Sequence, residues 1–240
     1  MWRAKYNYIK LFLLLALVVF LFAFSSVRNS SRKVSEPDIK FIGEDNLFIT
    51  RETVSKLLIQ NQQGVKKMPK ETLDLNQLET ALNSNPMIKS AQVYITVNGE
   101  LKADVEQKKP IARVSTNASY YIDDQGTYMP LSSNHSARVP LVTGQVDKND
   151  LKTVFIMANK IDHDEFLKKN VIEIHQDENK TIYLKLRQCS FMVQLGSINH
   201  LDKKINNLKA FYKKSLKENT LNNYGKVNLQ FDNQVVCTKS

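Results

Sequence analysis

Few residues of this 240-residue chain have the type and spacing that catalysis or metal binding requires. No two of the four histidines are four residues apart, which is the spacing that places two zinc ligands on one face of a helix. Asp123 and Asp124 could form an acid–base pair, but Gln125 and Gly126 follow them, which is typical of a turn between strands. We therefore expect no catalytic residue and no metal site. The four histidines are His135, His163, His175 and His200.

Phosphate-binding loops and nucleophile motifs are absent from the sequence as well. No two of the seven glycines are closer than 18 residues, so no glycine-rich loop can surround a phosphate group. Ser30 and Lys33 match the S-x-x-K pattern, but neither S-D-N nor K-T-G accompanies it. The sequence predicts no cofactor, no small-molecule substrate and no enzymatic activity.

The chain is basic, with a formal net charge of +10. Many of its lysines fall in an amphipathic stretch, 198–217, whose apolar residues recur at three- and four-residue spacing. We expect the lysines to lie mostly on the opposite face, as a solvated surface or as a site for an acidic partner or an anionic headgroup. Nucleic acid is not expected, because stacking aromatic residues do not interleave with the lysines. These lysines are Lys203, Lys204, Lys209, Lys213, Lys214 and Lys217.

An apolar run, 11–24, follows a basic N-terminus and continues without charge to Val27. As a helix these 17 residues span about 26 Å, slightly less than the hydrocarbon core of a bilayer. We expect a cytoplasmic tail at 1–10, a retained transmembrane helix at 11–27 and extracytoplasmic domains after it. The alternative is a secretory signal that is cleaved after Ser25.

The rest of the chain predicts an α+β protein with two extracytoplasmic domains. A polar linker at 28–38 precedes a strand, two helices that begin after Thr50 and Asp74, and two strands joined by a two-residue turn, Asn98-Gly99. Short strands then dominate, which predicts a mostly antiparallel β domain with helices packed on one face. The boundary is expected near Pro110. Cys189 and Cys237 could form a disulfide or remain free thiols.

Several segments in a fixed order resemble one family. They include FIGEDNLFITRETVSKLL, then LNQLETALNSNPMIKSAQVYITVNGELKADVEQKKPIARV, YYIDDQGTYMPLS, VPLVTGQV, FMVQLG and VNLQFDNQVV. Together they resemble the FtsQ/DivIB family of bacterial cell-division proteins. The resemblance implies a POTRA domain at 39–109, an FtsQ-type β domain at 110–240 and no catalysis.

The same resemblance implies a role and a location. The chain would be a single-pass scaffold of the divisome in the cell inner membrane, at the division site, with its N-terminus in the cytoplasm. It would bind small single-span division proteins, FtsL and FtsB or their DivIC-like counterparts, and link them to septal peptidoglycan synthesis. The alternative is a POTRA-containing assembly or chaperone factor of the cell envelope.

The expected partner site is the hairpin formed by 226–231 and 234–238. A terminal strand tends to lie at a sheet edge, where free backbone groups can pair with an added strand. The resemblance points to the same segment and places a partner-contacting aromatic residue at Phe231. Lys209, Lys213 and Lys217, four residues apart, could attract acidic partner residues; alternatively, this is a closing hairpin beside a solvated helix. The candidate residues are Val227, Leu229, Phe231, Val235, Val236, Lys209, Lys213 and Lys217.

Overall fold

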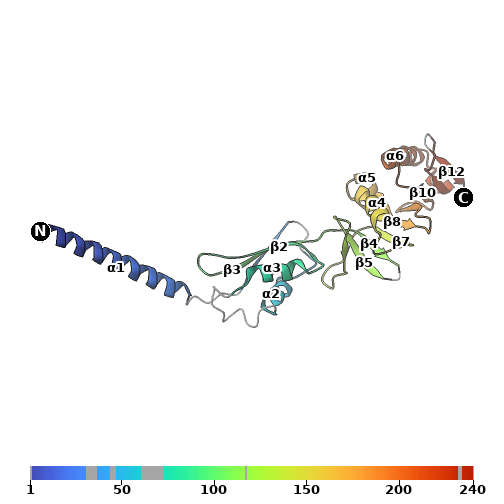
Figure 1. Ribbon diagram of the computed structural model, residues 1–240. Helices are drawn as coiled ribbons and strands as arrows, with labels where there is room; N and C mark the ends of the chain where they lie inside the picture. The colour runs from blue at the N-terminus through green and yellow to red at the C-terminus, as the bar shows by residue number, and fades with distance from the viewer. Residues whose placement is uncertain are drawn as a thin grey trace. The chain divides into compact units, whose positions relative to one another are not determined.

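The computed structural model describes residues 2–30, 37–43, 47–60, 73–116, 118–231 and 234–239. The chain divides into two compact units, Met1–Gln107 and Lys108–Ser240 (Figure 1). Each unit contains its own hydrophobic core and its own β-sheet.

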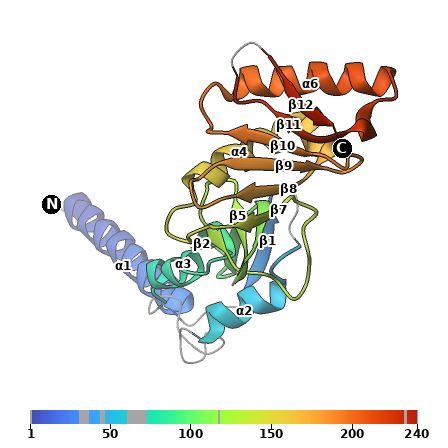
Figure 2. The same cartoon turned by 90° about the vertical axis from the view of Figure 1, so that its right-hand side faces the viewer.

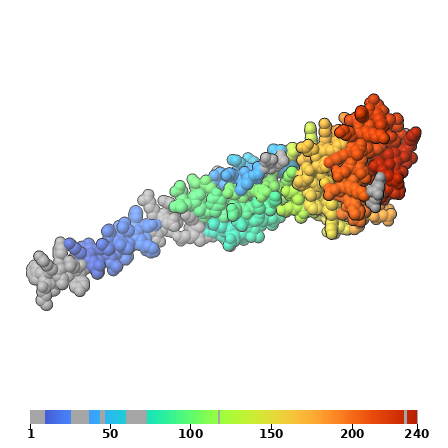
Figure 3. Space-filling model, turned by 90° about the horizontal axis from the view of Figure 1, so that it is seen from above, coloured from blue at the N-terminus to red at the C-terminus, as the bar shows by residue number. Residues whose placement is uncertain are grey.

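The first element of the chain is helix α1, Trp2–Ser30. Large apolar side chains between Leu11 and Phe24 are exposed on it, and Figure 3 shows this part of the chain in blue. Within the described residues, no helix has both the length and the apolar character needed to cross a bilayer. The expected transmembrane helix at 11–27 is therefore not supported.

A three-stranded sheet with two helices follows α1 in the first unit. The predicted order of strand, helix, helix, strand and strand is confirmed. The third strand of this sheet is central, pairing parallel with the first and antiparallel with the second. The elements are β1 (Asp38–Ile42), α2 (Arg51–Gln60), α3 (Leu75–Asn83), β2 (Ile88–Ile95) and β3 (Leu101–Gln107).

Helix α3 begins where the sequence predicts. The carboxylate of Asp74 accepts a hydrogen bond from the Gln77 N–H at 3.1 Å, as an N-cap residue does. Leu78 and Leu82, four residues apart, are fully buried in the core of the unit. The cap fixes the start of the helix, and this apolar stripe fixes the face that it turns to the sheet.

Two side chains of α3 occupy the outer edge of β2. The N–H of Val93 donates to Glu79 Oε2 at 3.1 Å, and the N–H of Ala91 donates to Asn83 Oδ1 at 2.8 Å. Strand β2 lies at one end of the three-stranded sheet, so these N–H groups have no strand to pair with. The helix therefore supplies hydrogen-bond acceptors that a neighbouring strand would otherwise supply.

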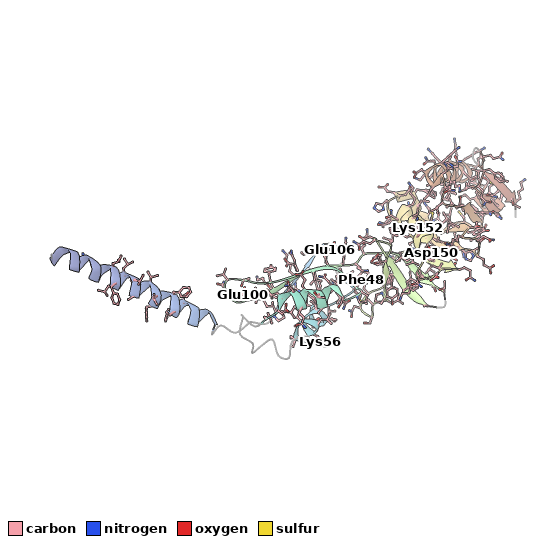
Figure 4. All side chains as sticks on the ribbon, in the orientation of Figure 1. Phe48, Lys56, Glu100, Glu106, Asp150 and Lys152 are labelled. Carbon is pink, nitrogen blue, oxygen red and sulfur yellow. The ribbon has the colours of Figure 1, made fainter. Side chains whose placement is uncertain are left out.

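The side chain of Gln107 fixes the segment before α2. Its Oε1 accepts hydrogen bonds from the N–H groups of Phe48 (labelled in Figure 4) and Ile49, at 3.0 and 3.1 Å. Its Nε2 donates to the Ile49 carbonyl oxygen at 3.0 Å. All three residues are buried, so this amide satisfies backbone groups that water cannot reach.

The turn between β2 and β3 differs from the expected two-residue turn. The Thr96 N–H donates to the Glu100 carbonyl, and the Gly99 N–H donates to the Thr96 carbonyl, each at 2.9 Å. Gly99 has a φ of 87°, in the left-handed region. This is a three-residue loop with glycine in the left-handed position, so the prediction of a two-residue turn at Asn98-Gly99 is wrong.

The second unit contains one nine-stranded sheet in the order β12-β11-β10-β9-β8-β7-β4-β5-β6 (Figure 2). Five neighbouring pairs are antiparallel, which confirms a mostly antiparallel sheet. Three pairs are parallel: β4 with β7, β7 with β8, and β10 with β11. The strands are β4 (Pro110–Ser115), β5 (Ser119–Asp123), β6 (Tyr128–Met129), β7 (Leu141–Gly144), β8 (Val171–Gln176), β9 (Ile182–Leu186), β10 (Met192–Gly196), β11 (Tyr224–Asn228) and β12 (Val236–Lys239).

Helices and alternating strand residues form the core of this unit. Along β9, Ile182, Leu184 and Leu186 are buried, whereas Lys185 between them is exposed. Most lysines of helix α6 face solvent, as expected. Lys204 is an exception: it is buried, and its Nζ donates to the Ser197 carbonyl at 2.7 Å. The helices are α4 (Lys152–Asp162), α5 (Glu165–Asn170), α6 (Leu201–Lys217) and the 3-10 helix η3 (Leu221–Asn223).

Asp123 is the last residue of β5, directly before the turn to β6, and it is fully buried. Its carboxylate contacts Lys108 Nζ at 2.7 Å. It also accepts the N–H groups of Gln125 and Thr127, at 3.0 and 2.7 Å, and the Thr127 hydroxyl. The predicted turn is confirmed, and the carboxylate is surrounded by donors from its own domain.

We expect Asp123→Ala to lower the free energy of unfolding by about 3 to 5 kcal/mol, because it leaves Lys108 without its buried anion and frees backbone donors in the turn. Urea denaturation of the purified protein measures this change. The matched control is Asp202→Ala, which removes an exposed partner of Lys160 and should cost about 1 kcal/mol or less. Equal losses in the two variants would contradict a special role of the buried carboxylate.

Candidate partner interface

Strand β12 lies at one end of the nine-stranded sheet and pairs antiparallel with β11. Val236 is opposite Asn228, Cys237 opposite Val227 and Thr238 opposite Lys226. Figure 2 shows β12 as the last strand of the series that runs from β8. Among the described residues no strand pairs with its other side, so β12 presents an open edge.

The candidate apolar residues of the hairpin differ in exposure. Val227 and Leu229 are buried in the core, and Val235 is half-buried against it. Phe231 is 46% exposed and Val236 is 39% exposed. Of these residues only Phe231 and Val236 expose a large part of the side chain, whereas Val227 and Leu229 belong to the core.

A close backbone approach holds the hairpin on the sheet. The Leu229 N–H donates to the Gln194 carbonyl at 2.9 Å, which extends the contact between β10 and the chain after β11. Gly196 has a φ of 77°, and a Cβ atom there would lie 2.7 Å from Cγ of Gln230. Glycine adopts this left-handed conformation without strain, and it leaves room for the Gln230 side chain beside the end of β10.

Two of the three candidate lysines line a groove that contains no residue of β11 or β12. Lys209 and Lys213 line a groove of about 990 Å³, together with residues of α5 and the turn after β9. Lys209 forms an ion pair with Asp164. Lys217 is exposed in the last turn of α6. The groove and the β11–β12 hairpin are therefore two candidate surfaces, whereas the sequence predicted a single one.

Two carboxylates near this groove have altered acidity. Partial burial raises the pKa of Asp164, but the hydrogen bonds from Lys209 and from the Leu167 N–H have the larger, opposite effect. The pKa of Asp164 therefore lies below the ordinary value of 3.8. Asp162 behaves in the same way: burial opposes ionisation, and contacts with Lys168 and Lys109 bring its pKa below 3.8. Both groups are therefore ionised at neutral pH.

The described residues include acidic side chains, thiols and histidines, which can bind metal ions. They contain no cluster of three side chains that could hold a metal ion. Cys189 and Cys237 are free thiols, and burial raises the pKa of each. Of the histidines, His175 contacts the Thr143 hydroxyl at 2.9 Å, and His163 contacts the Asn159 carbonyl.

Sequence reasoning missed helix α5, which forms one wall of the groove. A signal was present, because Asp164 stands three residues before Leu167 and accepts its N–H at 3.1 Å. The run of polar residues His163-Asp164-Glu165 is also typical of a turn, which hides this start of a helix. Arg187, on the turn after β9, was also missed, because only the paired strands bring it near α5; its N–H donates to the Asn170 carbonyl at 2.7 Å.

The fold and the open edge define an α+β protein in which a βααββ domain precedes a β-rich domain. Residues 42–106 match the model of a POTRA-like domain. Residues 109–238, more than half of the chain, match the family model described as FtsQ/DivIB, C-terminal related. The chain belongs to this FtsQ/DivIB-related family. A search of curated proteins found no match.

We expect Asp164→Asn to reduce stability at neutral pH, because asparagine keeps the N-cap but removes the charge that pairs with Lys209. The folded pKa of Asp164 is depressed, so its contribution is present above 3.8 and is lost as the pH falls through the folded pKa. The stability difference from the wild type should therefore shrink with acidification, as measured by urea denaturation at a series of pH values. An unchanged difference down to about pH 2 would contradict this assignment.

Proposed function

We propose that this protein is a non-enzymatic scaffold of the bacterial division machinery that captures another membrane-bound division protein by strand addition at β12. The observation that carries the proposal is the open edge of β12 in the domain that matches the FtsQ/DivIB family. An added strand would gain main-chain hydrogen bonds without any specialised side-chain chemistry.

The exposed side chains beside this edge support a specific site. Phe231 and Val236 are each already about half-buried, so covering them fully would contribute roughly 1 kcal/mol per side chain. Lys226 and Lys239 are exposed on the paired strands and would favour a partner with acidic residues. Lys217 could add a similar exposed pair, worth about 0.2 to 1 kcal/mol. Backbone pairing and apolar burial would therefore dominate the affinity.

The partners that we propose are FtsL- and FtsB-like or DivIC-like single-span proteins, through which the scaffold would act on septal peptidoglycan synthesis. The family match and the open edge support this proposal. We also propose that 39–109 acts as the POTRA domain and 110–240 as the partner-binding β domain.

Attachment to the cytoplasmic membrane is part of the proposal. Its support is the apolar run at 11–24, whose described side chains are exposed on α1. Exposure of so many large apolar side chains to water is unfavourable, and a bilayer would remove that cost. The proposed topology places the N-terminus in the cytoplasm and the two domains outside it, at the division site.

We expect proline substitution in β12 to separate partner capture from folding. Successive residues of an edge strand direct their N–H groups alternately to the neighbouring strand and outward. Of Val236→Pro and Cys237→Pro, one should therefore break a bond to β11, and the other should remove only a donor to the added strand. The second variant should stay folded and bind the purified FtsB- or DivIC-like partner at least about ten-fold more weakly.

The matched controls are Val236→Ile and Cys237→Ser, which keep both N–H groups and the apolar surface of position 236 and should bind normally. Circular dichroism melting identifies which proline variant is folded, and calorimetry measures the affinity. The edge site is wrong if the folded proline variant binds with the affinity of the wild type.

We expect the full-length protein to remain in the membrane fraction after alkaline carbonate extraction, because its apolar run would be buried in lipid. A variant that lacks residues 2–27 should be recovered in the soluble fraction. N-terminal sequencing distinguishes a retained anchor from a removed signal. A mature protein that begins at Ser26, or a full-length chain that carbonate releases, would contradict the anchor.

A further inference from the structure

A groove on the second unit has a basic lining that the β12 edge does not explain. It lies between α5, the turn after β9 and α6, and its volume is about 990 Å³. Glu165 is the only acidic residue among those that line it. The basic residues of its lining are Lys168, Lys169, Arg187, Lys209 and Lys213.

Internal ion pairs neutralise only part of this charge. Lys168 contacts Asp162 at 2.7 Å, and Lys209 is paired with Asp164. Lys169, Arg187 and Lys213 have no acidic partner among the residues that the structure describes. Three cations of the lining are therefore available to an anionic ligand.

The lining continues into an adjoining depression of about 360 Å³, where Asp162 is also present but is paired with Lys109 and Lys168. Lys168 and Arg187 line both spaces, and Arg138 lines the second. Because two residues are shared, an extended ligand could follow one track from α6 to the segment before β7. Such a track suits a chain molecule better than a single small anion.

The groove also has an apolar wall. The rings of Phe166 and Tyr212 meet edge to face with centroids 5.2 Å apart, and both residues line the groove. Leu216, one turn after Tyr212 on α6, is 54% exposed. A ligand that carries an apolar side chain beside its acidic groups would therefore cover surface that now faces water.

The walls are held in place by contacts within the domain. The Asn170 side chain donates to the Phe166 carbonyl at 2.8 Å, and the Asn170 carbonyl accepts the Arg187 N–H at 2.7 Å. These bonds join α5 to the turn after β9. The groove therefore exists without a ligand, which reduces the ordering that binding would require.

We propose that this groove binds an acidic polypeptide segment with an apolar anchor residue, as a second docking surface separate from the β12 edge. A phosphate polymer fits the lining less well, because only one arginine lines the larger groove and the apolar wall would remain uncovered. No residue of β11 or β12 is among those lining either depression. The proposal therefore does not depend on strand addition at β12.

The test uses the full chain and a short dye-labelled peptide that is rich in glutamate and carries two leucines. Fluorescence anisotropy measures the binding of this peptide to the wild type and to the double variant Arg187→Glu/Lys213→Glu. We expect the double variant to bind at least about ten-fold more weakly, because two attractive contacts become repulsive.

The matched control is Lys203→Glu/Lys214→Glu, which makes the same change in net charge at exposed positions of α6 that do not line the groove. It should change the affinity by less than about two-fold. Leu216→Ser, at an exposed position, should weaken binding of this peptide but not of a peptide whose leucines are replaced by serine.

Equal weakening in the groove variant and the control would show attraction by overall charge and would overturn the proposal. Displacement of the peptide by inorganic polyphosphate, together with no effect of Leu216→Ser, would overturn it in favour of a phosphate polymer. Thermal melting of each variant establishes that the losses do not come from unfolding.

Discussion

Backbone hydrogen bonding at the ends of its two sheets is the constraint on which the organisation of this protein depends. A strand at the end of a sheet has N–H and C=O groups that must be covered, bonded to water or offered to another chain. In the first unit, Glu79 and Asn83 cover part of this edge on β2. In the second unit the described residues leave the outer side of β12 open. The β2 edge and the β12 edge thus meet the same requirement differently.

The places of a few acidic residues in the fold determine where positive charge remains on the second unit. The clustering of lysines in the sequence does not. Asp162 contacts both Lys109 and Lys168, so one carboxylate fixes two lysines. Asp164 fixes Lys209 and caps α5 at the same time. These few acidic residues hold parts of the domain together, and they leave a surplus of positive charge between α5 and α6. A basic net charge alone would not have located that surplus.

Local rules predicted the elements well, and long-range contacts account for the differences. The start of α3 at Asp74 follows from a cap residue and an apolar stripe that lie within a few residues of each other. Such a local pattern can be read from one sequence alone. The parallel pairing of β10 with β11 is different, because α6 separates the two strands in the chain. Likewise, no local pattern marks Gln107 as the partner of Phe48, or Lys213 as a neighbour of α5. These contacts exist only once the sheets have formed.

The residues Gln107 and Lys108 are adjacent in the chain, yet each completes a different domain. Gln107 bonds to Phe48 and Ile49, whereas Lys108 neutralises the buried carboxylate of Asp123. A fragment of the second domain that starts at Pro110 would therefore enclose a charge without its counter-ion, although every strand of the sheet would be present. When the two domains are expressed separately, the first should end at Gln107 and the second should begin at Lys108. A cut two residues later would transfer the counter-ion of one domain to the other.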